Sequence, residues 1–228
     1  MVKDPRIDTW SFKKYQDPAI LIWSGLLILA GLGAIINPTL ISFLVLFAAI
    51  LVWGIILYFF RDPSREVIKE MGLVVSPCDG EVVSIETLEE KTYLEAKTLR
   101  ISVFLSLFDV HVQRIPLAGK VSLVEHKPGK YLQAFRQEAS DVNEYIAMVI
   151  ESEYGNILVK QIAGILARRC INYAHRGDEV ETGQRFGHIK FGSRVDLFLP
   201  RSAEIKIKVG DKIYGGLTPV AKLNYDDE

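Results

Sequence analysis

The stretch from Pro18 to Phe60 contains no Asp, Glu, Lys, Arg or His, and this constrains the fold more than any other feature of the sequence. A helix needs about 20 apolar residues to cross a bilayer core, and the stretch is roughly twice that length. Asn37-Pro38-Thr39 interrupts it once, and proline after asparagine favours a turn over continued helix. The sequence therefore predicts a transmembrane helical hairpin, with helices from Ala19 to Ile36 and from Leu40 to Phe60.

Basic residues flank the apolar stretch on both sides. They are Lys3, Arg6, Lys13 and Lys14 before it, and Arg61, Arg65 and Lys69 after it. Positive charge collects on the cytoplasmic side of membrane helices. We therefore expect a cell-membrane protein with both ends of the hairpin in the cytoplasm. A helical hairpin buried inside a soluble core is the less favoured alternative, and a cleaved signal peptide would be shorter.

The chain after Asp62 is rich in charge and is predicted to form a separate β-rich domain. Short β-branched runs punctuated by Gly or Pro are typical of strands. They occur at 80–85, 100–105, 120–124, 146–150, 157–162, 194–198 and 204–209, whereas 163–170 suits either a strand or a short helix. The predicted class is mainly β (α+β), as a compact sandwich or barrel-like domain. The expected division is a membrane-anchoring segment at 1–62 and a catalytic domain at 63–228.

Composition narrows the classes of function. The formal net charge is -1, so nothing indicates nucleic-acid binding, which usually needs a basic excess. Two cysteines, Cys78 and Cys170, are too few for a disulfide framework. The sequence has no CxxC motif or Cys/His cluster, so no metal site is predicted.

Three polar clusters lie beside predicted strands, at 76–80, 109–114 and 187–196. Each alone is typical of an ordinary turn or loop. Together they supply a carboxylate at Asp79, an imidazole at His111 and a hydroxyl at Ser193. That combination can turn a serine into a nucleophile, with a base beside it and a carboxylate to orient the base. A serine hydrolase is one use of the set, but Ser193 is not in the Gly-x-Ser-x-Gly motif of the nucleophile elbow.

Gly192-Ser193 allows a second use of the same hydroxyl. A serine can attack the carbonyl of the preceding residue, and glycine leaves that carbonyl open because it has no Cβ. The resulting ester is lost when the serine α-proton is removed, and hydrolysis of the dehydroalanine leaves a pyruvoyl group. A pyruvoyl carbonyl can form an imine with a substrate amine and accept electrons as CO2 leaves.

Several motifs occur in a fixed order along the chain. They are Phe59-Phe60-Arg61-Asp62-Pro63, Ser76-Pro77-Cys78-Asp79-Gly80, Phe108-Asp109-Val110-His111-Val112-Gln113-Arg114 with Pro116, Pro128-Gly129-Lys130-Tyr131-Leu132, the stretch 139–144, and Phe191-Gly192-Ser193. This ordered set resembles the phosphatidylserine decarboxylase family, in particular its short bacterial and archaeal type. The N-terminal apolar hairpin is also similar to that of the short members.

The resemblance implies a self-cleaving, pyruvoyl-dependent carboxy-lyase. Cleavage between Gly192 and Ser193 would give a β chain, 1–192, and an α chain, 193–228, that stay associated. Ser193 would become the covalent pyruvoyl group, His111 would serve processing and then proton transfer, and Asp79 would be the acidic member of the processing triad. The expected product is phosphatidylethanolamine from phosphatidylserine, or the ether-lipid equivalent from archaetidylserine.

The chain departs from the family pattern near these motifs. Phe191-Gly192-Ser193-Arg194 replaces the Leu-Gly-Ser-Thr form of the longer enzymes, with the scissile pair unchanged. Arg114 stands where some relatives have a second histidine, and Cys78 stands where many have alanine. Basic side chains are expected to hold the substrate phosphate, and the candidates are Arg114, Lys130 and Arg194. The expected partners are the phosphoserine lipid, the membrane and the two chains of one precursor, and a homo-oligomer stays open.

Two other functions remain as alternatives. A lipoyl- or biotinyl-like carrier or binding module on a membrane anchor would also use Ser76-Pro77-x-Asp79-Gly80 before a strand, but Lys190 lacks the flanking residues of a modified lysine. A membrane-bound metallopeptidase would need a close His pair with a carboxylate, and neither His-x-His nor HExxH occurs.

Overall fold

A computed structural model describes residues 18–133, 139–164, 170–189 and 193–224 of the chain. The chain divides into two compact units, of which one ends at Asp62 and the other begins at Pro63. The two units are described separately below.

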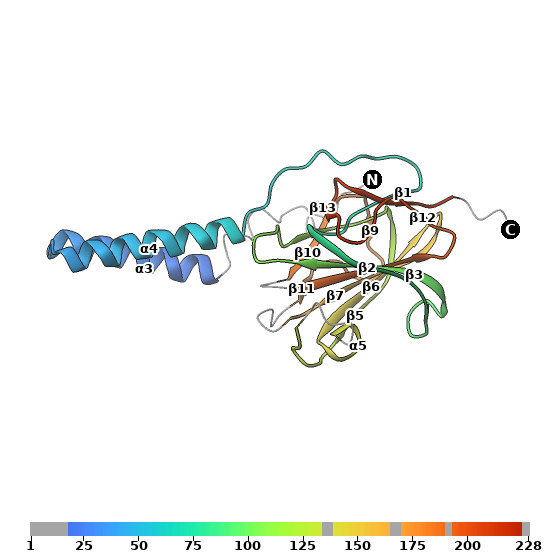
Figure 1. Cartoon of the computed structure of the whole chain (residues 1–228), viewed down its shortest axis with the longest axis horizontal. Coiled ribbons are helices and arrows are strands. Elements are labelled where there is room, and N and C mark those ends of the chain that lie inside the picture. Colours follow the sequence, from blue (N-terminus) through green and yellow to red (C-terminus); the bar gives the residue numbers. More distant parts are fainter. Residues whose placement is uncertain (1–17, 134–138, 165–169, 190–192, 225–228) are drawn as a thin grey trace. The chain divides into compact units, whose positions relative to one another are not determined.

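The first unit is a pair of antiparallel helices, α3 (Pro18–Ile36) and α4 (Leu40–Phe59), which lie side by side (Figure 1). Both are long and apolar enough to cross a membrane. The turn between them is stabilised by a capping box, because Ser42 N donates to Thr39 Oγ1 at 3.3 Å and Thr39 N donates to Ser42 Oγ at 2.9 Å. The predicted helical hairpin is confirmed, and its bounds differ by one residue at each outer end.

The second unit is built from strands and one short helix. In the described residues they are β1 (Leu73–Val75), β2 (Gly80–Glu90), β3 (Ala96–Leu105), β4 (Val112–Arg114), β5 (Gly119–Lys127), α5 (Ala139–Val142), β6 (Tyr145–Ser152), β7 (Gly155–Ile162), β8 (Cys170–Asn172), β9 (Glu179–Val180), β10 (Arg185–Ile189), β11 (Ser193–Pro200), β12 (Glu204–Ile205), β13 (Lys212–Ile213) and β14 (Pro219–Lys222).

Within these ranges the strands form one large sheet and two small ones. The large sheet has the order β13-β2-β3-β11-β7-β6-β5-β9, and it curls strongly (Figure 1). The small sheets have the orders β1-β14-β12 and β4-β10-β8. The pairings between these named strands are all antiparallel. The prediction of a mainly β domain after an apolar helical hairpin is therefore confirmed.

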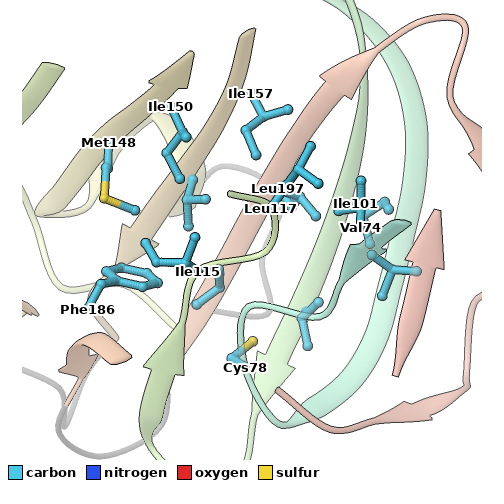
Figure 2. Packing of buried hydrophobic residues seen from close by; sticks show 14 of the residues in the cluster. Val74, Cys78, Ile101, Ile115, Leu117, Met148, Ile150, Ile157, Phe186 and Leu197 are labelled. Carbon is cyan, nitrogen blue, oxygen red and sulfur yellow. The ribbon is translucent and has the colours of Figure 1, made fainter. Parts of the chain in front are cut away.

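The main hydrophobic core lies on one face of the large sheet. Side chains alternate between the two faces of a strand, so every second residue points inward. On β11 these are Val195, Leu197 and Leu199, which are fully buried in the main core. Figure 2 shows Leu197 of β11 and Ile101 of β3 among the packed core side chains.

The run predicted at 204–209 is shorter in the structure, because β12 ends at Ile205. The chain turns soon afterwards, where Lys208 N donates to Asp211 Oδ2 at 3.0 Å. Asp211 N in turn donates to Lys208 O at 3.2 Å. A carboxylate that accepts from a nearby backbone N–H favours a turn over a strand. The turn at 208–211 therefore explains why the strand is shorter than predicted.

Candidate active site

One row of residues runs across the large sheet and shows which chain segments meet at the same end. The register places opposite one another, in order, Lys127 of β5, Tyr145 of β6, Ile162 of β7, Arg194 of β11, Phe104 of β3, Glu81 of β2 and Lys212 of β13. Since neighbouring strands are antiparallel, β2 and β11 begin near this row, whereas β3 and β5 end near it. Adjacent strands are about 5 Å apart, so the row brings distant segments together.

The predicted site residues lie at this end of the sheet. Asp79 directly precedes β2, and Ser193 is the first residue of β11. His111 follows the turn at the end of β3, and Lys130 follows β5. Residues from motifs far apart in the sequence thus lie at the same end of the sheet. Asp79 and Ser193 are on or beside the two strands that flank β3, whereas Lys130 follows a strand three places beyond β11.

Ser193 lies opposite Leu105 of β3 and is fully buried. Its side chain has the same alternation as Val195 and Leu197, so it faces the main core. Among the described residues, Ser193 Oγ has no hydrogen-bond partner. Buried polar atoms are nearly always paired, so a buried hydroxyl in this state needs an explanation, and a chemical role is one. Lys190, Phe191 and Gly192 lie outside the described residues.

His111 is buried, and the turn that precedes it orients its imidazole ring. His111 Nδ1 lies 2.9 Å from the main-chain oxygen of Asp109. A carbonyl oxygen can only accept, so Nδ1 carries the hydrogen, and the neutral ring has its lone pair at Nε2. The Asp109 carboxylate fixes the turn by accepting from Ser106 N at 2.8 Å and from Ser106 Oγ at 2.7 Å. His111 is therefore oriented as a base at Nε2.

Asp79 is buried and accepts hydrogen bonds at both carboxylate oxygens. Arg65 Nη1 donates to Oδ1 at 2.6 Å, and Arg65 Nη2 donates to Oδ2 at 2.8 Å. Gly215 N also donates to Oδ1, at 2.8 Å. Sequence reasoning missed this partner, because Arg65 entered only as one of the positive charges beside the apolar stretch. The one feature of the sequence that could have indicated Arg65 is its position two residues after the motif Arg61-Asp62-Pro63.

Of the three predicted phosphate ligands, Arg114 and Arg194 are buried and Lys130 is exposed. The guanidinium of Arg114 donates to Gly183 O at 3.0 Å and to Pro63 O at 3.1 Å. The main chain of Lys130 pairs with the segment at 142–144, which leaves its side chain in solvent beside the site end of the sheet.

Arg194 follows Ser193 directly, but its side chain lies on the other face of β11. Its Nε donates to Asp196 Oδ1 at 2.6 Å, and its Nη2 donates to Ser102 Oγ at 2.7 Å. Ser140 Oγ completes the cluster by donating to Asp196 Oδ2 at 2.7 Å. Because side chains alternate along a strand, Ser193 faces the main core whereas Arg194 faces the polar cluster on the other side of the sheet.

The thiol of Cys78 lies next to Asp79 in the chain and is completely buried. Burial raises the pKa of Cys78 well above its usual value, and the nearby carboxylates of Asp79, Asp109 and Asp196 raise it further. Cys78 packs in the main hydrophobic core, where it is shielded from solvent. The thiolate is the nucleophilic form of cysteine, and the direction of the pKa disfavours it. Within the described residues no group of three or more His, Cys, Asp or Glu side chains is placed to hold a metal ion.

Comparison with known proteins identifies the family of this chain. The family model described as phosphatidylserine decarboxylase matches residues 54–221. A phosphatidylserine decarboxylase proenzyme of Carboxydothermus hydrogenoformans is 35% identical over 210 residues, which cover 91% of this chain and 99% of that protein. Proenzymes with the same description from Symbiobacterium thermophilum and Amoebophilus asiaticus are each 42% identical, over 74% and 76% of this chain and 79% and 77% of their own lengths.

The chain therefore belongs to the phosphatidylserine decarboxylase family. Proenzymes of this family become carboxy-lyases that depend on a pyruvoyl group. The buried Ser193 hydroxyl fits the origin of such a group, because a pyruvoyl group is made from a serine at a cleavage point.

Proposed function

We propose that this chain is a membrane-anchored phosphatidylserine decarboxylase proenzyme that cleaves its own Gly192–Ser193 bond. The observation that carries the assignment is the buried hydroxyl of Ser193, which has no hydrogen-bond partner among the described residues and lies at the sheet end shared with His111 and Asp79. Cleavage yields a β chain, 1–192, and an α chain, 193–228.

The self-cleavage begins at the hydroxyl of Ser193. Its Oγ attacks the carbonyl carbon of Gly192, while Nε2 of His111 accepts the hydroxyl proton. The C–N bond between Gly192 and Ser193 then breaks as His111 gives that proton to the Ser193 nitrogen, and an ester replaces the peptide bond. Removal of the Ser193 α-proton breaks the Cβ–O bond, so Gly192 leaves as a carboxylate. One water then replaces the amine nitrogen, which departs as ammonia. The carboxylate of Asp79 stabilises the positive charge that His111 acquires.

In the mature enzyme, the pyruvoyl group made from Ser193 supplies a carbonyl that holds the substrate amine and withdraws electrons as CO2 leaves. His111 returns a proton to the carbon that lost CO2. Lys130 binds the phosphate, because its ammonium is exposed at the same sheet end. Arg194 is the weaker candidate for binding the phosphate, since its guanidinium already forms an ion pair with Asp196. The head groups of ester- and ether-linked lipids are alike, so both kinds of lipid fit this assignment.

The two apolar helices anchor the enzyme in the membrane where its lipid substrate resides. Basic residues on both sides of the helices favour a cytoplasmic position for the catalytic unit. An anchor of this kind keeps the active site near a substrate that does not leave the bilayer.

Intact-mass measurement of the purified full chain tests the proposal. We expect two polypeptides whose summed mass is that of the precursor plus one water minus one ammonia, whereas simple hydrolysis would add only the water. Ser193→Ala should abolish cleavage and decarboxylation together. Ser152→Ala is the matched control, because Ser152 lies in the β6–β7 turn at the other end of the sheet. A fully active, uncleaved precursor would disprove the proposal.

The same spectra test the carrier alternative, and an activity assay with a chelator tests the metallopeptidase. A lipoyl or biotinyl mass on a lysine would support the carrier module. Loss of activity on chelation of metal ions would support the metallopeptidase.

A further inference from the structure

The first residues of the β unit contact its candidate active site through one buried side chain. Residues 63–70, here called the linker segment, have no helix or strand and run in extended form toward β1 (Figure 1). The side chains of Arg65 and Val67 are partly buried, whereas Glu66 and Ile68 between and after them are exposed. The linker segment therefore presents alternate residues to the β domain.

Contacts with the β domain occur along most of the linker segment. Pro63 O accepts from Arg114, Val67 packs where Gly183 leaves room, and Lys69 Nζ pairs with Glu181 at 2.9 Å. At its end, Lys222 donates to Glu70 and lowers the pKa of that carboxyl. These contacts attach the linker segment to the β domain over a path that passes Asp79.

The pair between Arg65 and Asp79 is unlike the other ion pairs of the linker segment. Its two side chains are each only 6% exposed, whereas those of Lys69 and Glu181 are 64% and 45% exposed. Both nitrogens of the Arg65 fork contact the carboxylate, and Nη1 also donates to Gly215 O at 2.5 Å. A two-point contact fixes the plane of a carboxylate as well as its position, and it is stronger than a single charged bond.

We propose that Arg65 is a positioning residue for self-cleavage, which holds the carboxylate of Asp79 in the orientation that processing requires. The linker segment, which follows the apolar helices in the chain, is thereby part of the processing site. This inference rests on the proposed role of Asp79 in cleavage. It adds a residue that acts through Asp79.

The test follows the rate of self-cleavage of newly made full-length chain in membranes. Arg65→Gln removes the charge and the fork, and we expect cleavage to slow by roughly 10- to 100-fold, as displacement of a catalytic group typically costs. Arg65→Lys keeps the charge without the fork and should fall between Arg65→Gln and the unmodified chain. Lys69→Gln, in the exposed pair of the same segment, should cleave at the normal rate.

A second measurement separates positioning from general damage to the fold. The fraction of Arg65→Gln that does mature should decarboxylate at the normal rate per pyruvoyl group, because Asp79 acts in processing. A turnover per pyruvoyl group that also falls would instead show general damage to the fold and overturn the inference. Guanidinium ion added to Arg65→Ala should restore cleavage, whereas urea should not.

The outcomes also separate this inference from the proposed function. If the unmodified chain cleaves, Ser193→Ala does not, and Arg65→Gln cleaves at the normal rate, then only the role of Arg65 is wrong. If the unmodified chain does not cleave at Gly192–Ser193, the proposed function itself fails. If Arg65→Gln does not fold, Arg65→Lys decides, and normal cleavage in that variant overturns the inference.

Discussion

Arg194 and Asp196 lie two positions apart on β11 and form an ion pair, with Nε 2.6 Å from Oδ1 and with side chains only 2% and 0% exposed. The pair lies on the face of β11 opposite to Ser193. Removing two charges from water is costly unless each finds its partner, so the two side chains depend on one another. We infer that the pair supports the strand that carries Ser193 and takes no part in the chemistry at Ser193.

Removing one member of this pair should destabilise the β domain. Arg194→Gln or Asp196→Asn leaves a buried charge without its partner, which typically costs about 3–5 kcal/mol. Denaturant unfolding in the Ser193→Ala background, where every molecule stays uncleaved, measures the loss. Lys206→Gln is the control, since its pair with Glu204 is exposed and should contribute less than about 1 kcal/mol. Equal stability of the Arg194 and Lys206 variants would contradict the structural role.

Lys130 should influence substrate binding and leave the chemical step unchanged. A hydrogen bond to a charged group contributes about 1.5–3 kcal/mol, so Lys130→Gln should raise KM roughly tenfold or more. The value of kcat should hardly change, because the phosphate is distant from the bond that breaks. Steady-state kinetics with phosphatidylserine in mixed micelles gives both numbers. Lys120→Gln is the matched control, as Lys120 is exposed at the opposite end of β5. An unchanged KM in Lys130→Gln would remove Lys130 from the binding site.

The contact between the linker segment and the β domain can be tested at a glycine. Gly183 has φ of +78°, and a Cβ there would overlap the side chain of Val67. Gly183→Ala should therefore destabilise the domain by more than about 1 kcal/mol and also slow self-cleavage by moving the linker segment. Gly177→Ala is the control, because Gly177 has φ of +93° with no atom near the added Cβ. It has the same backbone strain without the collision, so similar behaviour of both variants would argue against the contact.

The sequence predicted best the features that depend on residues close together in the chain. The apolar hairpin was predicted from the length of the charge-free stretch and its Asn-Pro break, and the longer strands from short β-branched runs. Asp79, His111 and Ser193 were predicted from residue type beside those strands. The Arg65–Asp79 pair escaped this reasoning, because it joins an irregular linker to a turn and depends on a tertiary path that no local pattern specifies. Arg194 shows the converse limit, since proximity to Ser193 in sequence suggested a shared site although strand alternation separates the two side chains.

The buried thiols make a further prediction about reactivity. Both thiols are buried, and burial raises the pKa of Cys78 and of Cys170, which disfavours the reactive thiolate. Neither cysteine of the native protein should react with a maleimide until the protein is unfolded, and mass spectrometry measures the adducts. Cys78→Ala should cleave normally, because the thiol has no role in the proposed chemistry. Rapid labelling of native Cys78, or failure of the variant to mature, would contradict this assignment.

Unreactive native cysteines allow the membrane topology to be tested with single introduced ones. Asn37 lies in the turn between α3 and α4, and Asn156 is exposed in the β domain. If the helices cross the membrane as a hairpin, Asn37→Cys should react with an impermeant maleimide added outside intact cells. Asn156→Cys should react only after lysis, because basic flanks favour a cytoplasmic β domain. Labelling of both positions from the same side would show that the helices do not span the bilayer as proposed.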